Sequence, residues 1–302
     1  MAAFFFLCSN SYIITNMKVI RSDVLGFCFG VRRAVEEAEK ALIDAKNKVY
    51  SLGPLIHNEA VLEKLSKNGL NVINEDKICN IEDGSVVIIR AHGVEPFVIQ
   101  KLNEKNCQII DATCPRVKAN QKMAEKYSSK NNYVILSGDN NHGEVKGVAG
   151  YAGQNFRLVQ NPLEAKNLEL EEGNDKEIVL LSQTTFSRSE FETIAKILQE
   201  KFSHVTVKNT ICPATSERQT SLLELCKKVD GVLVIGGKSS ANTKRLFQIA
   251  NENAKNACLI QNKEDIPKEF FSYETVGLTA GASTPDDIIE QVENTLLLGY
   301  NK

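Results

Sequence analysis

The chain of 302 residues is long enough for two or three compact domains of about 150 residues each. Its 42% hydrophobic and 25% charged residues are typical of a globular protein and exclude disordered, collagen-like and coiled-coil classes. The net charge of -2 excludes the overall positive field of a nucleic-acid-binding protein, and after the N-terminus no apolar run approaches the roughly 18 residues that span a membrane. We therefore expect neither a nucleic-acid nor a membrane partner.

Residues 1–16 lack the basic start of a signal peptide and the arginines of a transit peptide. We expect them to be a disordered extension or the product of a misassigned start, with Met17 as the natural first residue. The 8 cysteines are too sparse for a disulfide scaffold, and none forms a C-x-x-C pair, which favours a reducing compartment. We therefore expect a cytoplasmic protein, with a plastid-type organelle as the alternative.

From Lys18 onward, short β-branched runs alternate with helical periodicity, which predicts an α/β protein with parallel sheets. After a strand at Lys18–Ile20 and a turn through Gly26, the apolar face of a helix is formed by Val31, Ala34, Val35, Ala38, Leu42 and Ala45. Further strands are predicted at Val86–Ile89, Tyr133–Leu136, Ile178–Leu181, Gly231–Ile235 and Val276–Thr279. Each precedes a loop of Gly, Ser, Thr or His. Because ligands bind beyond the carboxyl ends of parallel strands, these loops indicate a shared central site.

Two helix starts have local signals. Ser187 followed by Glu190 predicts a capping box, in which each side chain accepts from the other residue's backbone N–H. Thr284 is predicted to be the N-cap residue of the last helix, followed by Pro285 in the first turn and by the acidic residue Asp287.

A weak internal repeat centres on three cysteines. Each repeat follows a strand or its loop and precedes a helix, in the segments Gly26-Phe27-Cys28, Ala112-Thr113-Cys114-Pro115 and Thr210-Ile211-Cys212-Pro213. The spacings of 86 and 98 residues equal about one small α/β unit. They predict three similar lobes that each deliver one thiolate to a common centre. We set the lobe boundaries at 17–112, 113–210 and 211–302, and leave open whether the first strand packs with the third lobe.

A cysteine just before a helix is expected to have a lowered thiol pKa, because the helix N-terminus carries a positive potential. Thiolates bind soft metals, and three of them leave one position open on a zinc ion or on one iron of a four-iron cluster. The alternative is that the cysteines are small buried hydrophobic residues. We assign that role to Cys79, Cys107, Cys226 and Cys258, which lie inside apolar or helical patterns.

Three of the four histidines, His57, His92 and His142, occupy loops flanked by glycine or asparagine. Imidazoles in such loops can donate to phosphate oxygens or transfer protons near neutral pH. Glu144, two residues after His142, is placed to act as an acid. The alternative for the histidines is an ordinary exposed turn, which is the role we expect for His204.

Three further loops are rich in small polar residues: Gln183–Thr185, 236–242 and Ala280–Ser283. Hydroxyls, amides and helix N-termini bind phosphates well. The alternative is helix capping by Asn242 and Ser283, and capping and anion binding can coexist at one N-terminus.

The motifs, taken together and in order, resemble the 4-hydroxy-3-methylbut-2-enyl diphosphate reductases, the iron-sulfur enzymes that end the methylerythritol phosphate route to isoprenoids. The resemblance runs from about Met17 to the C-terminus. It rests on Gly26-Phe27-Cys28, Leu55-Ile56-His57-Asn58, Ala91-His92-Gly93-Val94, Asp111-Ala112-Thr113-Cys114-Pro115, His142-Gly143-Glu144-Val145, Gln183-Thr184-Thr185 and Thr279-Ala280-Gly281-Ala282-Ser283.

The resemblance implies a trefoil of three α/β lobes around a [4Fe-4S] cluster held by Cys28, Cys114 and Cys212. The substrate hydroxyl would bind the open iron, and a ferredoxin or flavodoxin would supply single electrons for conversion of this allylic diphosphate to isopentenyl and dimethylallyl diphosphates. Glu144 matches the proton source, with Thr184 and His142 assisting. The substrate-binding residues implied are His57, His92, His142, Thr184, Ser240, Asn242 and Ser283. Ala241 departs from the family pattern, where many relatives carry serine.

Two other functions stay open from the residues alone. Zinc on the same three cysteines would make a hydrolase or hydratase with Glu144 as the base. A non-catalytic module would use the polar loops to hold a phosphorylated metabolite, with the cysteines merely buried.

Overall fold

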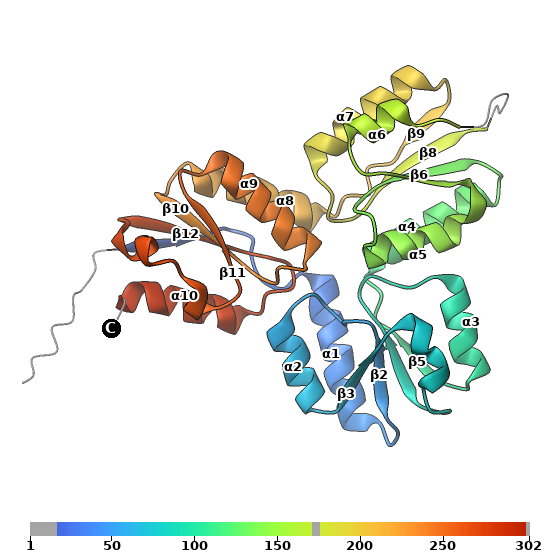
Figure 1. The fold of residues 1–302 in the computed structure, drawn as a ribbon, viewed down its shortest axis with the longest axis horizontal. Coiled ribbons are helices and arrows are strands. Elements are labelled where there is room, and N and C mark those ends of the chain that lie inside the picture. The colour runs from blue at the N-terminus through green and yellow to red at the C-terminus, as the bar shows by residue number, and fades with distance from the viewer. Residues whose placement is uncertain (1–16, 171–175, 300–302) are drawn as a thin grey trace, which may run out of the picture.

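The computed structural model describes residues 17–170 and 176–299, and the expectation for residues 1–16 therefore lies outside the described part. Three four-stranded sheets, each parallel throughout, form three α/β lobes around a common centre (Figure 1). The α/β fold class and the trefoil arrangement are confirmed. Among the described residues, no helix is both long and apolar enough to cross a membrane.

The first lobe has the strand order β3-β2-β4-β5. Its strands are β2 (Val49–Leu52), β3 (Leu70–Ile73), β4 (Val86–Ile89) and β5 (Gln108–Asp111). Its helices are α1 (Phe29–Asp44), α2 (Glu59–Lys67), α3 (Pro96–Glu104) and the 3-10 helix η1 (Glu75–Asn80). The apolar face predicted for α1 packs on this sheet: Ala34, Val35 and Ala38 are buried, whereas Val31, Leu42 and Ala45 are partly buried. Ala41, which was not predicted, is buried there as well.

The second lobe has the order β7-β6-β8-β9. Its strands are β6 (Tyr133–Ser137), β7 (Phe156–Val159), β8 (Ile178–Ser182) and β9 (Val205–Val207). Its helices are α4 (Pro115–Ser128), α5 (Gly143–Ala152), η2 (Gly153–Asn155), α6 (Pro162–Asn167) and α7 (Arg188–Lys201). Of the two hydrogen bonds predicted for the capping box at α7, one is present and the other is absent among the described residues. Ser187 accepts from the N–H of Glu190 at 3.4 Å, but the Glu190 carboxylate forms an ion pair with Arg245 instead of returning to the cap.

The third lobe has the order β1-β12-β10-β11. Its strands are β1 (Lys18–Arg21), β10 (Gly231–Ile235), β11 (Ala257–Ile260) and β12 (Thr275–Ala280). Its helices are α8 (Pro213–Cys226), α9 (Ala241–Asn253), η3 (Lys263–Asp265), η4 (Lys268–Ser272) and α10 (Asp286–Leu298). The predicted cap of α10 is wrong: Pro285 is the N-cap residue, and the Thr284 hydroxyl donates to the carbonyl oxygen of Ile235 at 2.9 Å. That bond ties the loop after β12 to the end of β10.

The central strands are covered on both faces, which explains their continuous apolar sequences. In β4, Val86 and Ile88 pack on the α1 side, whereas Val87 and Ile89 pack into a second cluster with α3. The same alternation recurs in the other two sheets. Only the loops at the strand ends are therefore free to form a site.

The three sheets have equivalent topology once β1 is counted as the last strand of the third lobe. β1 pairs with β12 in register from Lys18 opposite Thr275 to Arg21 opposite Leu278. It thus takes the edge position that β5 and β9 take in their own sheets. Each edge strand leads into the first helix of the next lobe, so the chain passes between lobes at three equivalent places.

Candidate active site

The three predicted cysteines lie at those passages between lobes. Cys28, Cys114 and Cys212 are the N-cap residues of α1, α4 and α8. Their backbone N–H groups make equivalent bonds, to the carbonyl oxygens of Ala282 at 3.1 Å, Ala91 at 2.9 Å and Thr184 at 2.9 Å. The accepting residues follow β12, β4 and β8, so the repeat in the sequence is also a repeat in space.

All three thiols are free, half-buried and turned toward one central cavity. Gly30 permits the close approach of α1 to Cys114, because a Cβ at residue 30 would lie 2.6 Å from the Cys114 Sγ. Burial raises the pKa of the Cys114 thiol, and the N–H groups of Arg116 and Val117 oppose this effect. The expectation of a lowered pKa is therefore wrong for Cys114, since burial outweighs the helix N-terminus.

A buried arginine lies beside two of the cysteines. Arg218 on α8 is 3% exposed and donates to the carbonyl oxygen of Ala280 at 3.3 Å. Burial is the largest cause and lowers its pKa, while the nearby sulfurs of Cys28 and Cys212, when ionised, raise it. A fixed cation next to converging sulfurs stabilises thiolates, so the donor set fits a soft metal ion or an iron-sulfur cluster.

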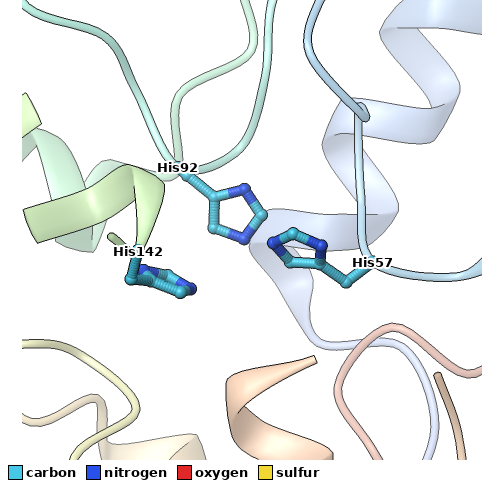
Figure 2. Close-up of side chains that lie close together, drawn as sticks. All are labelled: His57, His92 and His142. Carbon is cyan, nitrogen blue, oxygen red and sulfur yellow. The ribbon is translucent and has the colours of Figure 1, made fainter. Parts of the chain in front are cut away.

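The three loop histidines form a cluster on the same cavity (Figure 2). Their ring centroids are 4.7 Å apart for His57 and His92, 5.0 Å for His92 and His142, and 6.0 Å for His57 and His142. One ring nitrogen from each lies within 4.8 Å of the others. We call this group the histidine cluster. The exposed-turn alternative does not apply, because all three are at most half-exposed, whereas His204 is exposed.

The histidine cluster is uncharged near neutral pH. Burial is the largest cause that lowers the pKa of each ring, and the charge of Arg90 acts in the same direction on all three. For His92 and His142 the neighbouring imidazoles add to this effect. The pKa of His142 falls to about 4. Its Nδ1 accepts from the Glu144 N–H at 3.2 Å and so caps α5. The proton of neutral His142 therefore resides on Nε2, which leaves that atom as a hydrogen-bond donor.

Glu144 is buried behind the cavity, with 1% of its surface exposed. Its Oε2 accepts from the Thr184 hydroxyl at 2.7 Å, and its Oε1 accepts from the Thr184 N–H at 2.8 Å and from Asn120 Nδ2 at 3.3 Å. Burial raises the pKa of Glu144 to about 7, against the opposing effect of these hydrogen bonds. A carboxyl group with this pKa can hold and release a proton at neutral pH.

The third lobe contributes neutral polar groups. Ser240, not Asn242, caps α9, accepting from the Thr243 N–H at 3.3 Å. Asn242 is 4% exposed, and its buried Nδ2 has no hydrogen-bond partner among the described residues. Ser283 does not cap α10 either, because Pro285 is the N-cap residue there, and the Ser283 hydroxyl donates to the carbonyl oxygen of His57 at 3.1 Å. The capping alternative for Asn242 and Ser283 is thus wrong, and Asn242 keeps an unused donor.

One cavity brings together every predicted site residue except Glu144, which reaches it through Thr184. The residues follow the two central strands of each sheet, where the strand order reverses and open α/β sheets bind ligands. They are His57 after β2, His92 after β4, His142 after β6, Thr184 after β8, Ser240 and Asn242 after β10, and Ser283 after β12.

Three residues of the site were not predicted: Asn120, Arg90 and Arg218. Asn120 is 1% exposed in the middle of α4 and also donates to the carbonyl oxygen of Ser182 at 2.9 Å. A polar residue at an apolar helix position is the one signal that the sequence offered for it. Arg90 and Arg218 have no comparable local signal, since arginines at a strand end or on a helix are usually exposed.

Comparison with known proteins supports a single family. The family described as LytB protein matches residues 19–297. A relative from Treponema denticola, named 4-hydroxy-3-methylbut-2-enyl diphosphate reductase, is 48% identical over 290 residues, covering 94% of this chain and 100% of the relative. A relative of the same name from Thermoanaerobacter sp. is 40% identical over 279 residues, covering 91% of this chain and 95% of the relative.

Solved structures agree. The E-1-hydroxy-2-methyl-but-2-enyl-4-diphosphate reductase from Plasmodium falciparum superposes with a TM-score of 0.87 at 31% identity, covering 92% of this chain and 87% of that chain. A second structure, described as (E)-4-hydroxy-3-methyl-but-2-enyl diphosphate reductase, the terminal enzyme of the non-mevalonate pathway, gives a TM-score of 0.67 at 37% identity, covering 92% of this chain and 98% of that chain. The chain is therefore an oxidoreductase that belongs to the LytB protein family.

Proposed function

We propose that this enzyme converts (E)-4-hydroxy-3-methylbut-2-enyl diphosphate to isopentenyl diphosphate and dimethylallyl diphosphate. The observation that carries the proposal is the meeting of three free thiols and three neutral imidazoles on one cavity, with a buried carboxyl group of raised pKa beside it. The reaction consumes two electrons and two protons: the C–O bond of the allylic alcohol breaks, a C–H bond forms, and water leaves.

Cys28, Cys114 and Cys212 are the ligands we propose for a [4Fe-4S] cluster. When bound, the cluster supplies electrons and an iron with an open coordination position for the substrate hydroxyl. The chain provides the thiolates from three lobes, and Arg218 offsets part of their negative charge. A ferredoxin or flavodoxin is the electron donor that we propose, in a cytoplasmic setting where the thiols stay reduced.

The diphosphate is proposed to bind the neutral donors at the other end of the cavity. His57, His92 and His142 each offer a ring N–H, and Ser240 offers a hydroxyl. Ser283 would donate to the ligand by exchanging its present bond to the carbonyl oxygen of His57. Asn242 supports this assignment, because its buried Nδ2 has no hydrogen-bond partner in the described part of the chain and an oxygen of the ligand would supply one. Neutral donors bind a phosphate oxygen without taking up protons themselves.

Glu144 is proposed to deliver the proton through Thr184. In its protonated form Glu144 donates to the Thr184 Oγ1, and the Thr184 hydroxyl hydrogen then points into the cavity. The pKa of about 7 leaves a large fraction of Glu144 protonated at neutral pH. His142 holds the start of α5 in place through its bond to the Glu144 N–H, which fixes the position of the acid.

The test is the iron, sulfide and zinc content of protein purified without oxygen, followed by turnover with a reduced one-electron mediator. About four irons per chain and dehydroxylation of the substrate are expected. Cys114→Ser is expected to lose the iron, whereas Cys258→Ser, a matched change outside the cavity, keeps it. One zinc per chain would instead support the hydrolase, and folded protein that takes up no metal would support the binding module.

A further inference from the structure

A second cavity adjoins the first at the histidine cluster. It shares His57, His92, His142 and Ala241 with the cavity of the cysteines, but none of the cysteines lines it. The three imidazoles, which face one another in Figure 2, therefore line both cavities. We call this second cavity the outer chamber. All three lobes contribute to it, so it opens where the lobes meet.

The outer chamber carries an excess of positive charge. Its lining includes Arg90, Lys146, Lys244 and Arg245, against one carboxylate, that of Asp139. Arg245 is already paired, 2.7 Å from Glu190 and 3.8 Å from Asp139. Within residues 17–170 and 176–299, neither lysine has a carboxylate within 4.0 Å. The imidazoles are neutral, so the wall adds no compensating charge.

Arg90 places a largely buried positive charge in the wall of this chamber. Its side chain is 16% exposed and forms one ion pair, 3.0 Å from Glu75. Two glycines make room for the guanidinium: a Cβ on Gly53 would overlap its Nη1, and one on Gly143 would lie 3.0 Å from its Nη2. Its buried Nε has no hydrogen-bond partner among the described residues.

Gly143 is also the first residue of α5, and a helix N-terminus carries partial positive charge. Arg90 and this N-terminus thus place two sources of positive potential side by side, and the carboxylate of Glu75 is paired with Arg90. Lys244, which lies on α9 of the third lobe and also lines the chamber, acts on the histidine cluster. Burial is the larger cause, but the charge of Lys244 also lowers the pKa of His57 and His142. A multivalent anion would balance this excess of positive charge.

We propose that the outer chamber is a capture site for the diphosphate group, where Lys146 and Lys244 attract the substrate before it reaches the neutral donors of the inner cavity. This inference rests on the proposed function. Charged clefts raise the association rates of oppositely charged ligands by about 10 to 1,000-fold at low ionic strength. Binding in the inner cavity then exchanges lysine contacts for imidazole, hydroxyl and amide donors.

The experiment compares Lys146→Gln/Lys244→Gln with Lys126→Gln/Lys196→Gln. The second pair changes the net charge equally, but its lysines lie on exposed surfaces of α4 and α7 away from both cavities. The measurement is kcat/KM for (E)-4-hydroxy-3-methylbut-2-enyl diphosphate, made on the anaerobic holoenzyme at 0.01 and 0.1 M salt. The Debye length falls between these conditions from about 30 to about 10 Å.

The chamber variant is expected to have a kcat/KM about tenfold below that of the native enzyme at 0.01 M salt, and to show little further change at 0.1 M. The control should keep the native salt dependence. Equal salt dependence in the two variants would overturn the proposal.

Binding of inorganic diphosphate by the same holoenzymes separates this inference from the function on which it rests. At low salt the chamber variant is expected to bind inorganic diphosphate about tenfold more weakly than the native enzyme, whether or not the enzyme reduces the allylic alcohol. If this loss appears without any dehydroxylation, the capture site stands and the reductase proposal fails. If turnover occurs but the affinity for inorganic diphosphate is the same in the chamber variant and in the native enzyme, the reductase proposal stands and the capture site fails.

Discussion

Thr184 joins the buried acid Glu144 to the central cavity. Its hydroxyl donates to the Glu144 Oε2 at 2.7 Å, and its backbone N–H donates to Oε1 at 2.8 Å. Thr184 lines the cavity, whereas Glu144, which is 1% exposed, does not. A carboxyl group held in this way can exchange a proton with the cavity only through a neighbour, and Thr184 is that neighbour.

Replacing this acid tests the proton source directly. Glu144→Gln keeps the size and the hydrogen-bond acceptor but removes the ionisable proton, so turnover is expected to fall by about 100-fold or more. Iron content and affinity for inorganic diphosphate should stay at the native level, because the carboxyl group touches neither site. The exposed Glu125→Gln on α4 is the matched control. Turnover of Glu144→Gln within tenfold of the control would remove Glu144 from the mechanism.

The same substitution changes how stability depends on pH. The folded pKa of Glu144 is about 7 and its ordinary value is 4.5. Between these values the folded protein binds more protons than the unfolded chain, so Glu144 stabilises fully below pH 4.5 and loses that contribution as pH rises through 7. Since each whole step in pKa corresponds to about 1.4 kcal/mol, about 3 kcal/mol of stability is involved.

Native and Glu144→Gln proteins should therefore be compared by anaerobic thermal unfolding at pH 5 and pH 8, at one scan rate. The native midpoint should fall relative to the variant as the pH rises. A constant difference between the two midpoints would show that the Glu144 pKa is not raised on folding.

The sequence predicted the structure correctly where a pattern repeats or where scarce residue types cluster. The continuous apolar run of β4 is buried on both faces and was predicted at its observed bounds, Val86–Ile89. The edge strand β3 was missed because Asn71 and Val72 are exposed and its pattern is too short to stand out. β3 gains its order from hydrogen bonds to β2, which a local pattern does not reveal. Position at an edge does not decide the outcome alone, because the edge strand β1 was predicted and the buried central strand β2 was missed.

The site residues that the sequence predicted were likewise those with a clear local signal. Histidines and cysteines are rare, so their positions in glycine-flanked loops and before helices were informative. Arg90 escaped notice because its burial depends on Gly53 and Gly143, which lie far away in the sequence. The Thr284 cap was wrong for a similar reason, since its hydroxyl is turned toward the carbonyl oxygen of Ile235, which lies far away in the sequence.

His142 combines two roles that a pair of substitutions separates. Its Nδ1 caps α5, and its Nε2 carries the proton that the ring can donate at the cavity. Asparagine is a good N-cap residue, so His142→Asn should retain stability, whereas His142→Ala should lose about 1 kcal/mol. Both variants lack the imidazole Nε2 donor and should bind inorganic diphosphate about tenfold more weakly, as expected for one lost hydrogen bond. Titration calorimetry and thermal unfolding measure the two effects, and native affinity in His142→Asn would exclude the imidazole as a diphosphate ligand.

Gly30 offers a test of the cysteine centre that leaves every proposed ligand unchanged. A Cβ at this position would lie 2.6 Å from the Cys114 Sγ, so Gly30→Ala is expected to displace the sulfur and lose most of the iron. Alanine is otherwise favoured over glycine in a helix by about 1 kcal/mol, so the protein should stay folded. Phe29→Ala, at the neighbouring position where the side chain is 73% exposed, should keep its iron. Iron analysis and circular dichroism check both variants. Full iron content in folded Gly30→Ala would mean that the position of the Cys114 sulfur does not determine metal binding, contrary to the ligand set proposed for this cavity.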